Sequence, residues 1–228
     1  MTQKQLYAIG GVLAVILLLV AGYFFFVAPS STAVTEAALP PERIAATDRT
    51  LGSPTAKVTV IEYAALTCPV CAAYNNTMFS QMKEKYIDTG KVYYVYRLFP
   101  IDQADPKAEK VARCLPPEMY FQFVDLLYRK QEEWGPEQMG ERQQGTPPQP
   151  KTEAGLMQMA RIAGMSTDKA MQCMNSTAED ARINKVADEA EKRYHVSGTP
   201  TFVIDGTPLD AGYDKFPAAL DAELAKKK

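Results

Sequence analysis

Two cysteines separated by two residues, Cys68 and Cys71, are the side chains in this chain best suited to redox chemistry. Residues three positions apart lie on the same side of a helix, so the two sulfurs can close a local disulfide. If Cys68 begins that helix, unpaired backbone N–H groups and the helix dipole stabilise its thiolate, and such cysteines have pKa values of roughly 3.5–7.5. The spacing therefore predicts thiol-disulfide exchange, with Cys68 as the attacked sulfur and Cys71 as the more buried, resolving thiol.

The segments around this pair have the pattern of a β-α-β unit. Residues 58–63 (VTVIEY) and 91–99 (KVYYVYRLF) are rich in β-branched and aromatic side chains, which is typical of strands. Residues 72–86 predict a helix between them, and a connection of that length favours a parallel strand pair. The cysteine pair is then expected between the end of the first strand and the start of the helix.

The rest of the chain predicts a helical insertion and then a return to the sheet. Between about 106 and 194 the pattern is helical, at 108–115, 119–134, 153–163, 168–174 and 178–194, with a Gly-, Pro- and Gln-rich loop at 135–151. After it we expect strands at 201–204 and 207–210 around an Asp205-Gly206 turn, and a closing helix at 217–225. The predicted order is β-α-β, helical insertion, β-β-α.

The N-terminal segment predicts export and a membrane anchor. Residues 6–28 are apolar and uncharged, long enough to cross a ~30 Å hydrocarbon core. Lys4 precedes them and no basic residue follows until Arg43, so the N-terminus is expected in the cytoplasm and the rest outside it. We predict a signal-anchor helix at 1–28, a flexible tether at 29–50 and one functional domain at 51–228.

A cleaved signal peptide is the alternative, because Ser31-Thr32-Ala33 resembles a small-residue cleavage site. Under either reading the domain lies outside the cytosol: on the periplasmic side of the inner membrane as a single-pass protein, or in the periplasm after cleavage. Disulfides persist in that compartment.

Composition argues against several other functions. The formal net charge is -2, so nucleic-acid binding is not expected. No glycine-rich phosphate loop is present, and thiol exchange needs no cofactor. His195 is the only histidine, and it is expected at a helix end or on the surface.

A copper- or other metal-binding module with Cys68 and Cys71 as soft ligands is an alternative function, although two cysteines do not complete a zinc site. A folding chaperone with a vestigial cysteine pair is a third reading.

Two stretches carry a resemblance to a known family. Residues 60–71, which end in Cys68-Pro69-Val70-Cys71, and residues 196–202, which contain Thr199-Pro200, are similar to the DsbA-like branch of the thioredoxin superfamily. The resemblance extends from about Gly52 to the C-terminus and includes the helical insertion. It implies a thioredoxin-like α/β fold and a thiol-disulfide oxidoreductase. It also implies that Pro200 is a cis proline facing the active-site sulfurs, with the Thr199 backbone binding substrate.

The resemblance implies further roles. Glu62 corresponds to a buried acid near the second cysteine, which could relay a proton from Cys71; its alternative is an exposed charge on the strand. Cys114 and Cys173 correspond to a structural disulfide of some members, with two free thiols as the alternative.

The resemblance also implies partners. The substrates would be exported cysteine-containing proteins, and a quinone-linked membrane protein of the DsbB or VKOR type would reoxidise the pair. Strongly oxidising members carry Pro-His where this chain has Pro69-Val70, so an isomerase or reductase stays open beside an oxidase.

Overall fold

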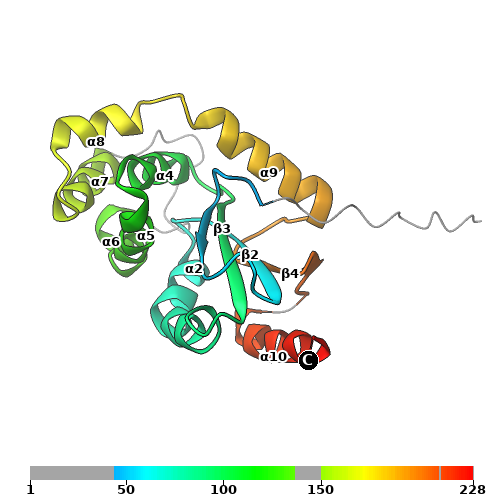
Figure 1. The fold of residues 1–228 in the computed structure, drawn as a ribbon. Coiled ribbons are helices and arrows are strands. Elements are labelled where there is room, and N and C mark those ends of the chain that lie inside the picture. The colour runs from blue at the N-terminus through cyan, green and yellow to red at the C-terminus, as the bar shows by residue number, and fades with distance from the viewer. Residues whose placement is uncertain (1–43, 137–149, 211, 228) are drawn as a thin grey trace, which may run out of the picture. The chain divides into compact units, whose positions relative to one another are not determined.

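The computed structural model describes residues 44–136, 150–210 and 212–227 (Figure 1). Its centre is a five-stranded sheet with the strand order β1-β3-β2-β4-β5. β2 (Val58–Ala64) and β3 (Val92–Leu98) are parallel, as predicted, with Val58 opposite Val92. β4 (Thr201–Ile204) pairs antiparallel with β2, and β5 (Thr207–Pro208) extends the sheet beyond it. The predicted strand at 207–210 is therefore two residues shorter than expected.

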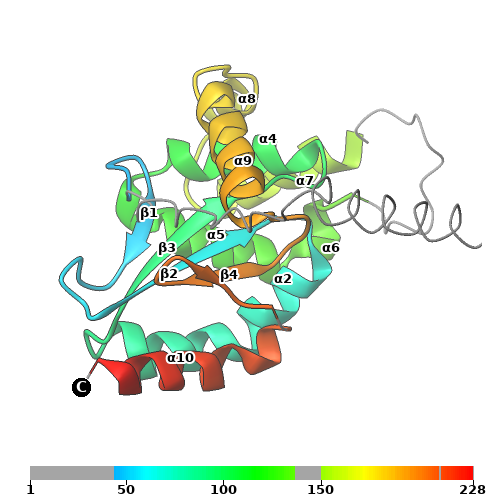
Figure 2. The ribbon, with the colours of Figure 1, turned by 90° about the vertical axis from the view of Figure 1, so that its right-hand side faces the viewer.

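The central strands carry apolar side chains on both faces of the sheet, and helices cover both faces, so these strands are buried on both sides. On one face, Val58, Val60 and Ala64 join a core that includes Phe216 and Leu220 of α10 (Phe216–Lys226). On the other face, Ile61 and Val203 join a smaller core, against which α9 (Asp180–Tyr194) packs. Figure 2 shows α9 and α10 on opposite sides of the strands. Alternate side chains of β2 thus point to opposite faces.

The predicted helix at 72–86 is present and begins three residues earlier, at Pro69. It runs as α2 (Pro69–Tyr74), a π-helical turn η1 (Asn75–Phe79), α3 (Ser80–Met82) and a second π-helical turn η2 (Lys83–Ile87). Proline suits the first turn because its missing N–H would have no partner there. Cys68 is the N-cap, so the cysteine pair lies at the helix start.

The helical insertion separates β3 from β4. It comprises α4 (Ala104–Cys114), the 3-10 turn η3 (Pro117–Met119), α5 (Tyr120–Arg129), α6 (Gln131–Trp134), α7 (Pro150–Ile162), α8 (Thr167–Met174) and α9. The helix expected at 119–134 is interrupted at Lys130, whose φ of -109° and ψ of 21° are not helical. A short 3-10 turn, η4 (Tyr213–Lys215), precedes α10.

The start of the domain differs from the prediction. β1 (Arg49–Leu51) pairs antiparallel with β3, and Asp48 forms a buried ion pair with Arg97, so the last residues of the predicted 29–50 tether belong to the folded domain. A three-residue strand carries almost no periodic signal, and its partner is more than forty residues away, which is why the sequence pattern missed it.

Several predictions lie wholly or mostly outside the described residues: the anchor helix at 1–28, most of the tether, and the loop at 135–151. Across the three described ranges, no helix is both long enough and apolar enough to span a membrane.

Candidate active site

The two cysteines lie where β2 gives way to α2. A tight turn, in which the Cys68 N–H donates to the Ala65 carbonyl at 3.2 Å, directs the chain from the strand into the helix. Cys68 has an extended backbone, and its Sγ accepts a hydrogen bond from the Cys71 N–H at 3.2 Å. Both cysteines are free, so the pair is in the dithiol state. The sulfur of Cys68 therefore occupies the position that satisfies an otherwise unpaired helix N–H.

Cys68 is largely buried, although it is predicted to be the attacked thiol. Only 4% of the residue is accessible and Cys71 is fully buried, whereas Val70 between them is 47% exposed. The order of burial, with Cys71 the deeper of the two, agrees with the prediction.

The two thiols differ strongly in acidity. Hydrogen bonds from the Cys71 thiol, together with backbone N–H groups of Cys71 and Val70, lower the pKa of Cys68 to about 6 despite its burial. Burial, followed by the interactions with Cys68, raises the pKa of Cys71 well above its ordinary value. At neutral pH Cys68 is therefore largely a thiolate, while Cys71 keeps its proton.

The Thr199-Pro200 segment faces Cys68 across the site. The peptide bond between Thr199 and Pro200 is cis, and the Thr199 carbonyl oxygen lies 3.3 Å from Cys68 Sγ. Thr201 begins β4, which is paired with β2, so the sheet itself fixes the distance between this loop and the cysteines. The structure thus brings together Cys68, Cys71, Thr199 and Pro200, which are far apart in the sequence.

Glu62 is buried, which contradicts the alternative of an exposed charge on the strand. Only 2% of the residue is accessible, and the Tyr94 hydroxyl donates a hydrogen bond to its carboxylate. Burial, opposed by the Tyr94 hydrogen bond and reinforced by the charge of Cys68, raises the pKa of Glu62 to about 7. The Glu62 charge also helps to raise the pKa of Cys71. Its proposed proton relay remains a prediction.

The active-site turn consists of residues 66–68, between β2 and α2. Two residues that hydrogen-bond to it were missed by the sequence reasoning. Asp105 accepts hydrogen bonds from Thr67, and Gln131 donates to the carbonyl groups of Leu66 and Cys68. Both belong to the helical insertion, and no local motif connects them with the cysteines. They could be found only after the chain was folded.

The remaining candidate residues lie away from the cysteine pair. Cys114 of α4 and Cys173 of α8 form a disulfide with a Cα–Cα distance of 6.2 Å, which is the pairing implied by the family resemblance. His195 is exposed at the C-terminal end of α9. Within the described part of the chain, no group of three or more His, Cys, Asp or Glu side chains could hold a metal ion.

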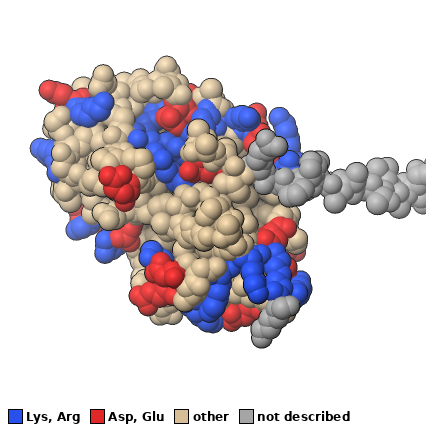
Figure 3. Space-filling view, viewed as in Figure 1, with Lys and Arg blue, Asp and Glu red and all other residues tan. Residues whose placement is uncertain are grey.

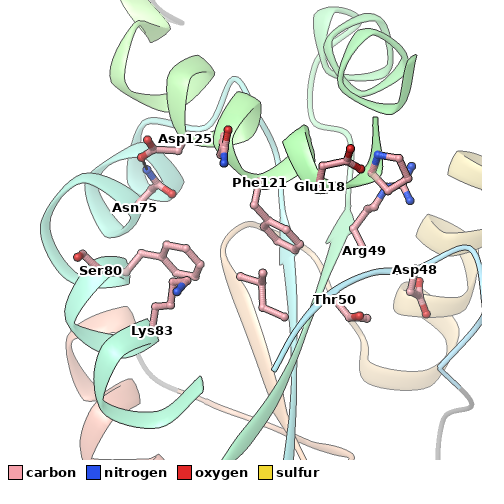
Figure 4. Close-up of a pocket in the computed structure, with 13 residues that line it drawn as sticks. Asp48, Arg49, Thr50, Asn75, Ser80, Lys83, Glu118, Phe121 and Asp125 are labelled. Atoms are coloured by element: carbon pink, nitrogen blue, oxygen red, sulfur yellow. Dashed lines mark hydrogen bonds between the residues drawn. The ribbon is translucent and has the colours of Figure 1, made fainter. Parts of the chain in front are cut away.

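A cavity beside the sheet offers no competing redox site. On the face in Figure 3, basic and acidic side chains are interspersed. A cavity of about 560 Å³ lies between β1, η1 and α5, with Phe121 pointing into its centre and Arg49, Lys83 and Asp125 around it (Figure 4). No cysteine lines it.

Comparisons with known proteins agree with this geometry. The thioredoxin family model matches residues 45–222. A protein of Rickettsia prowazekii (strain Madrid E), provisionally named a protein-disulfide oxidoreductase, is 30% identical over 179 residues, which are 78% of this chain and 61% of that protein.

Two solved structures are similar along most of the chain. The crystal structure of alpha-DsbA1 from Wolbachia pipientis has a TM-score of 0.68 and 27% identity, and the match covers 80% of this chain and 94% of that one. A protein-disulfide isomerase from Novosphingobium aromaticivorans has a TM-score of 0.66 and 25% identity, with coverages of 78% and 97%.

The fold and the paired thiols define a DsbA-like protein: a thioredoxin-type α/β domain with a helical insertion and a Cys-x-x-Cys site at a helix start. The chain belongs to the thioredoxin family. It spans about three fifths of the length of the first curated relatives that it matches, 61% and 62% in two Rickettsia proteins.

Proposed function

We propose that the protein is a thiol-disulfide oxidoreductase that forms or exchanges disulfide bonds in exported proteins. The observation that carries this proposal is the contrast between the two thiols: the pKa of Cys68 is lowered to about 6, while that of its neighbour Cys71 is raised. A sulfur stabilised as a thiolate is a good leaving group, so it is displaced readily from a disulfide.

The reaction follows from this contrast. In the oxidised protein, a substrate thiolate attacks Cys68 Sγ, the Cys68–Cys71 bond breaks, and Cys71 departs and takes up a proton. A second substrate thiolate then attacks the substrate sulfur of the mixed disulfide and releases Cys68 as a thiolate. The substrate loses two electrons and gains a disulfide, while the protein becomes the dithiol. Glu62, whose pKa is raised to about 7, is suited to exchange the Cys71 proton at neutral pH.

The substrate peptide is proposed to bind beside Pro200. The Thr199 carbonyl lies 3.3 Å from Cys68 Sγ, so an extended peptide that pairs with this backbone would have its cysteine next to Cys68. Pro69 and Val70 are exposed at the same place and would contact the peptide.

We further propose that the domain acts on the periplasmic side of the inner membrane, held there by a helix formed by residues 6–28. The apolar length of that segment and the absence of basic residues between Lys4 and Arg43 support this topology. The dithiol left by each turnover needs an electron acceptor, and a quinone-linked membrane protein of the DsbB or VKOR type would accept its two electrons.

A disulfide isomerase is the second candidate. It is favoured by Val70, which provides no imidazole beside the Cys68 thiolate, and by the similarity to the Novosphingobium aromaticivorans protein named a protein-disulfide isomerase. An isomerase acts from the dithiol state and an oxidase from the disulfide state. The two are therefore separated by the redox form that is active.

The test uses the full-length protein in detergent micelles with ribonuclease as substrate. Oxidised protein is mixed with reduced ribonuclease, and reduced protein is mixed with scrambled ribonuclease. An oxidase restores activity in the first assay and an isomerase in the second. Cys68→Ser should abolish both, whereas Cys71→Ser should accumulate a mixed disulfide at Cys68 that mass spectrometry detects. Wild-type protein inactive in both assays, or full activity of Cys68→Ser, would refute the proposal.

A further inference from the structure

Asp105 holds the residue that precedes the reactive cysteine. Its Oδ1 accepts the Thr67 N–H at 2.8 Å, and its Oδ2 accepts the Thr67 hydroxyl at 3.1 Å. Oδ2 also accepts the N–H groups of Ile101 and Asp102, both at 2.9 Å. Asp105 lies in the first turn of α4 and is completely buried. One carboxylate therefore ties the active-site turn to the start of the helical insertion.

Gln131 holds the same turn from a second helix. Its Nε2 donates to the Leu66 carbonyl at 2.8 Å and to the Cys68 carbonyl at 3.1 Å. The Cys68 carbonyl is also the acceptor of the first hydrogen bond of the helix, from Ala72 N–H at 3.1 Å. Gln131 begins α6, which follows α5 within the insertion.

These contacts surround a segment whose orientation decides how Cys68 reacts. Residues 66–68 carry the chain from β2 into α2, and a rotation of this turn would move Cys68 Sγ away from the Cys71 N–H and from the Thr199 carbonyl. Asp105 satisfies the N–H group in the middle of the turn, and Gln131 satisfies the carbonyls on either side of it. Leu66 and Cys68 are buried and Thr67 is half-buried. Losing either partner therefore leaves a polar group of this turn unpaired and poorly hydrated, which favours a shifted backbone.

We propose that Asp105 and Gln131 are positioning residues, through which the helical insertion holds Cys68 Sγ at the start of α2 and thereby sets the reactivity of that thiol. This inference rests on the proposed function, since it concerns the same sulfur. Neither side chain takes part in the exchange of electrons. Asp105 accepts hydrogen bonds from Thr67 and from the backbone of 101–102, and the Gln131 amide donates to the backbone carbonyl groups of Leu66 and Cys68.

A positioning role and a purely electrostatic role of Asp105 predict opposite results. Removal of a nearby negative charge would stabilise the Cys68 thiolate and lower its pKa. Removal of an anchor would instead weaken the hydrogen bonds to Cys68 Sγ and raise its pKa. Asp105→Asn keeps the size of the side chain but turns one acceptor into a donor, so it cannot satisfy both the Thr67 N–H and the three groups on Oδ2. Gln131→Met removes the amide without any change of charge.

The experiment measures the pKa of Cys68 from the pH dependence of its alkylation by iodoacetamide, in full-length protein reduced at Cys68 and Cys71. We expect the Cys68 pKa to rise from about 6 to ~7 in Asp105→Asn and in Gln131→Met. At pH 6 such a rise lowers the thiolate fraction from about one half to about one eleventh, so alkylation should slow by about fivefold. Asp168→Asn and Gln122→Met, at exposed positions of the same insertion, are the matched controls and should leave the rate unchanged.

Alkylation needs no protein substrate, so its outcome does not depend on whether the wild type passes the ribonuclease assays. An unchanged Cys68 pKa in both variants, with a lower melting temperature, would show a merely structural role and overturn the proposal. A lower pKa in Asp105→Asn with no change in Gln131→Met would overturn it in favour of simple electrostatics. If Asp105→Asn does not fold, the neutral variant Gln131→Met decides alone.

Discussion

Glu62 provides a quantitative test of how the buried acid affects stability. The pKa of its carboxyl is raised from 4.5 to about 7, chiefly by burial, and the charge of Cys68 is the smallest of the three causes. An acid whose pKa is higher in the folded state binds its proton more tightly there. Its contribution to folding is therefore complete below about pH 4.5 and is lost as the pH rises through 7. Glu62→Gln removes this dependence, and its amide oxygen can still accept the Tyr94 hydroxyl.

The expected magnitude follows from the shift. Each pKa unit corresponds to about 1.4 kcal/mol, so ionising Glu62 in the folded state costs about 3 kcal/mol in full. Between pH 5 and pH 8, most of this cost appears, and the wild type should lose about 2–3 kcal/mol of unfolding free energy relative to Glu62→Gln. Asp105, whose pKa is raised to about 6, titrates in both proteins and cancels in the difference.

The assay is urea unfolding of both proteins at pH 5 and pH 8. Cys68→Ser and Cys71→Ser are included in each, so that no thiol titrates and no active-site disulfide forms. The unfolding free energy of Glu62→Gln, minus that of the protein with Glu62, should be larger at pH 8 than at pH 5. A difference that stays constant between the two pH values would show that Glu62 ionises normally in the folded protein, and the burial argument would be wrong.

Three further predictions test other parts of the structure. Val70→His places an imidazole at an exposed position beside the Cys68 thiolate. The Cys68 pKa should therefore fall, and the reduction potential, measured in equilibrium with glutathione, should rise by ~30 mV. An unchanged potential would show that this position does not influence the thiolate. Replacement of Cys114 and Cys173 by alanine opens a loop with a sequence separation of 59, which should cost about 4 kcal/mol in urea unfolding on the chain-entropy model, while the alkylation rate of Cys68 stays the same. Gly155→Ala should lower the free energy of unfolding by about 1–3 kcal/mol, although alanine has the higher helix propensity. The reason is that the added Cβ would lie 2.5 Å from Trp134 Cα. A melting temperature at or above that of the wild type would show that α6 and α7 can separate without cost.

The sequence alone determined those features that depend on neighbours along the chain. The Cys68-x-x-Cys71 spacing required both sulfurs on one side of a helix start, and the structure has Cys68 as the N-cap of α2. Strands and helices followed from the periodicity of their side chains, since a buried surface repeats at a fixed interval in each. The resemblance supplied the cis Thr199-Pro200 bond and the Cys114–Cys173 pair, both of which are present. The anchor predicted at residues 6–28 stays a prediction.

Only the tertiary structure decided the features that depend on contacts between distant segments. β1 exists because β3 offers it a partner, and the low exposure of Cys68, 4%, is likewise a property of the folded chain. The hydrogen bond from Tyr94 to Glu62, and those of Asp105 and Gln131 to the active-site turn, are likewise absent from any local pattern. The physical reason is that the pKa and the hydrogen-bond partners of a side chain are set by the groups around it. Those groups come from distant parts of the sequence, as with Cys68 and Thr199, which are 131 positions apart.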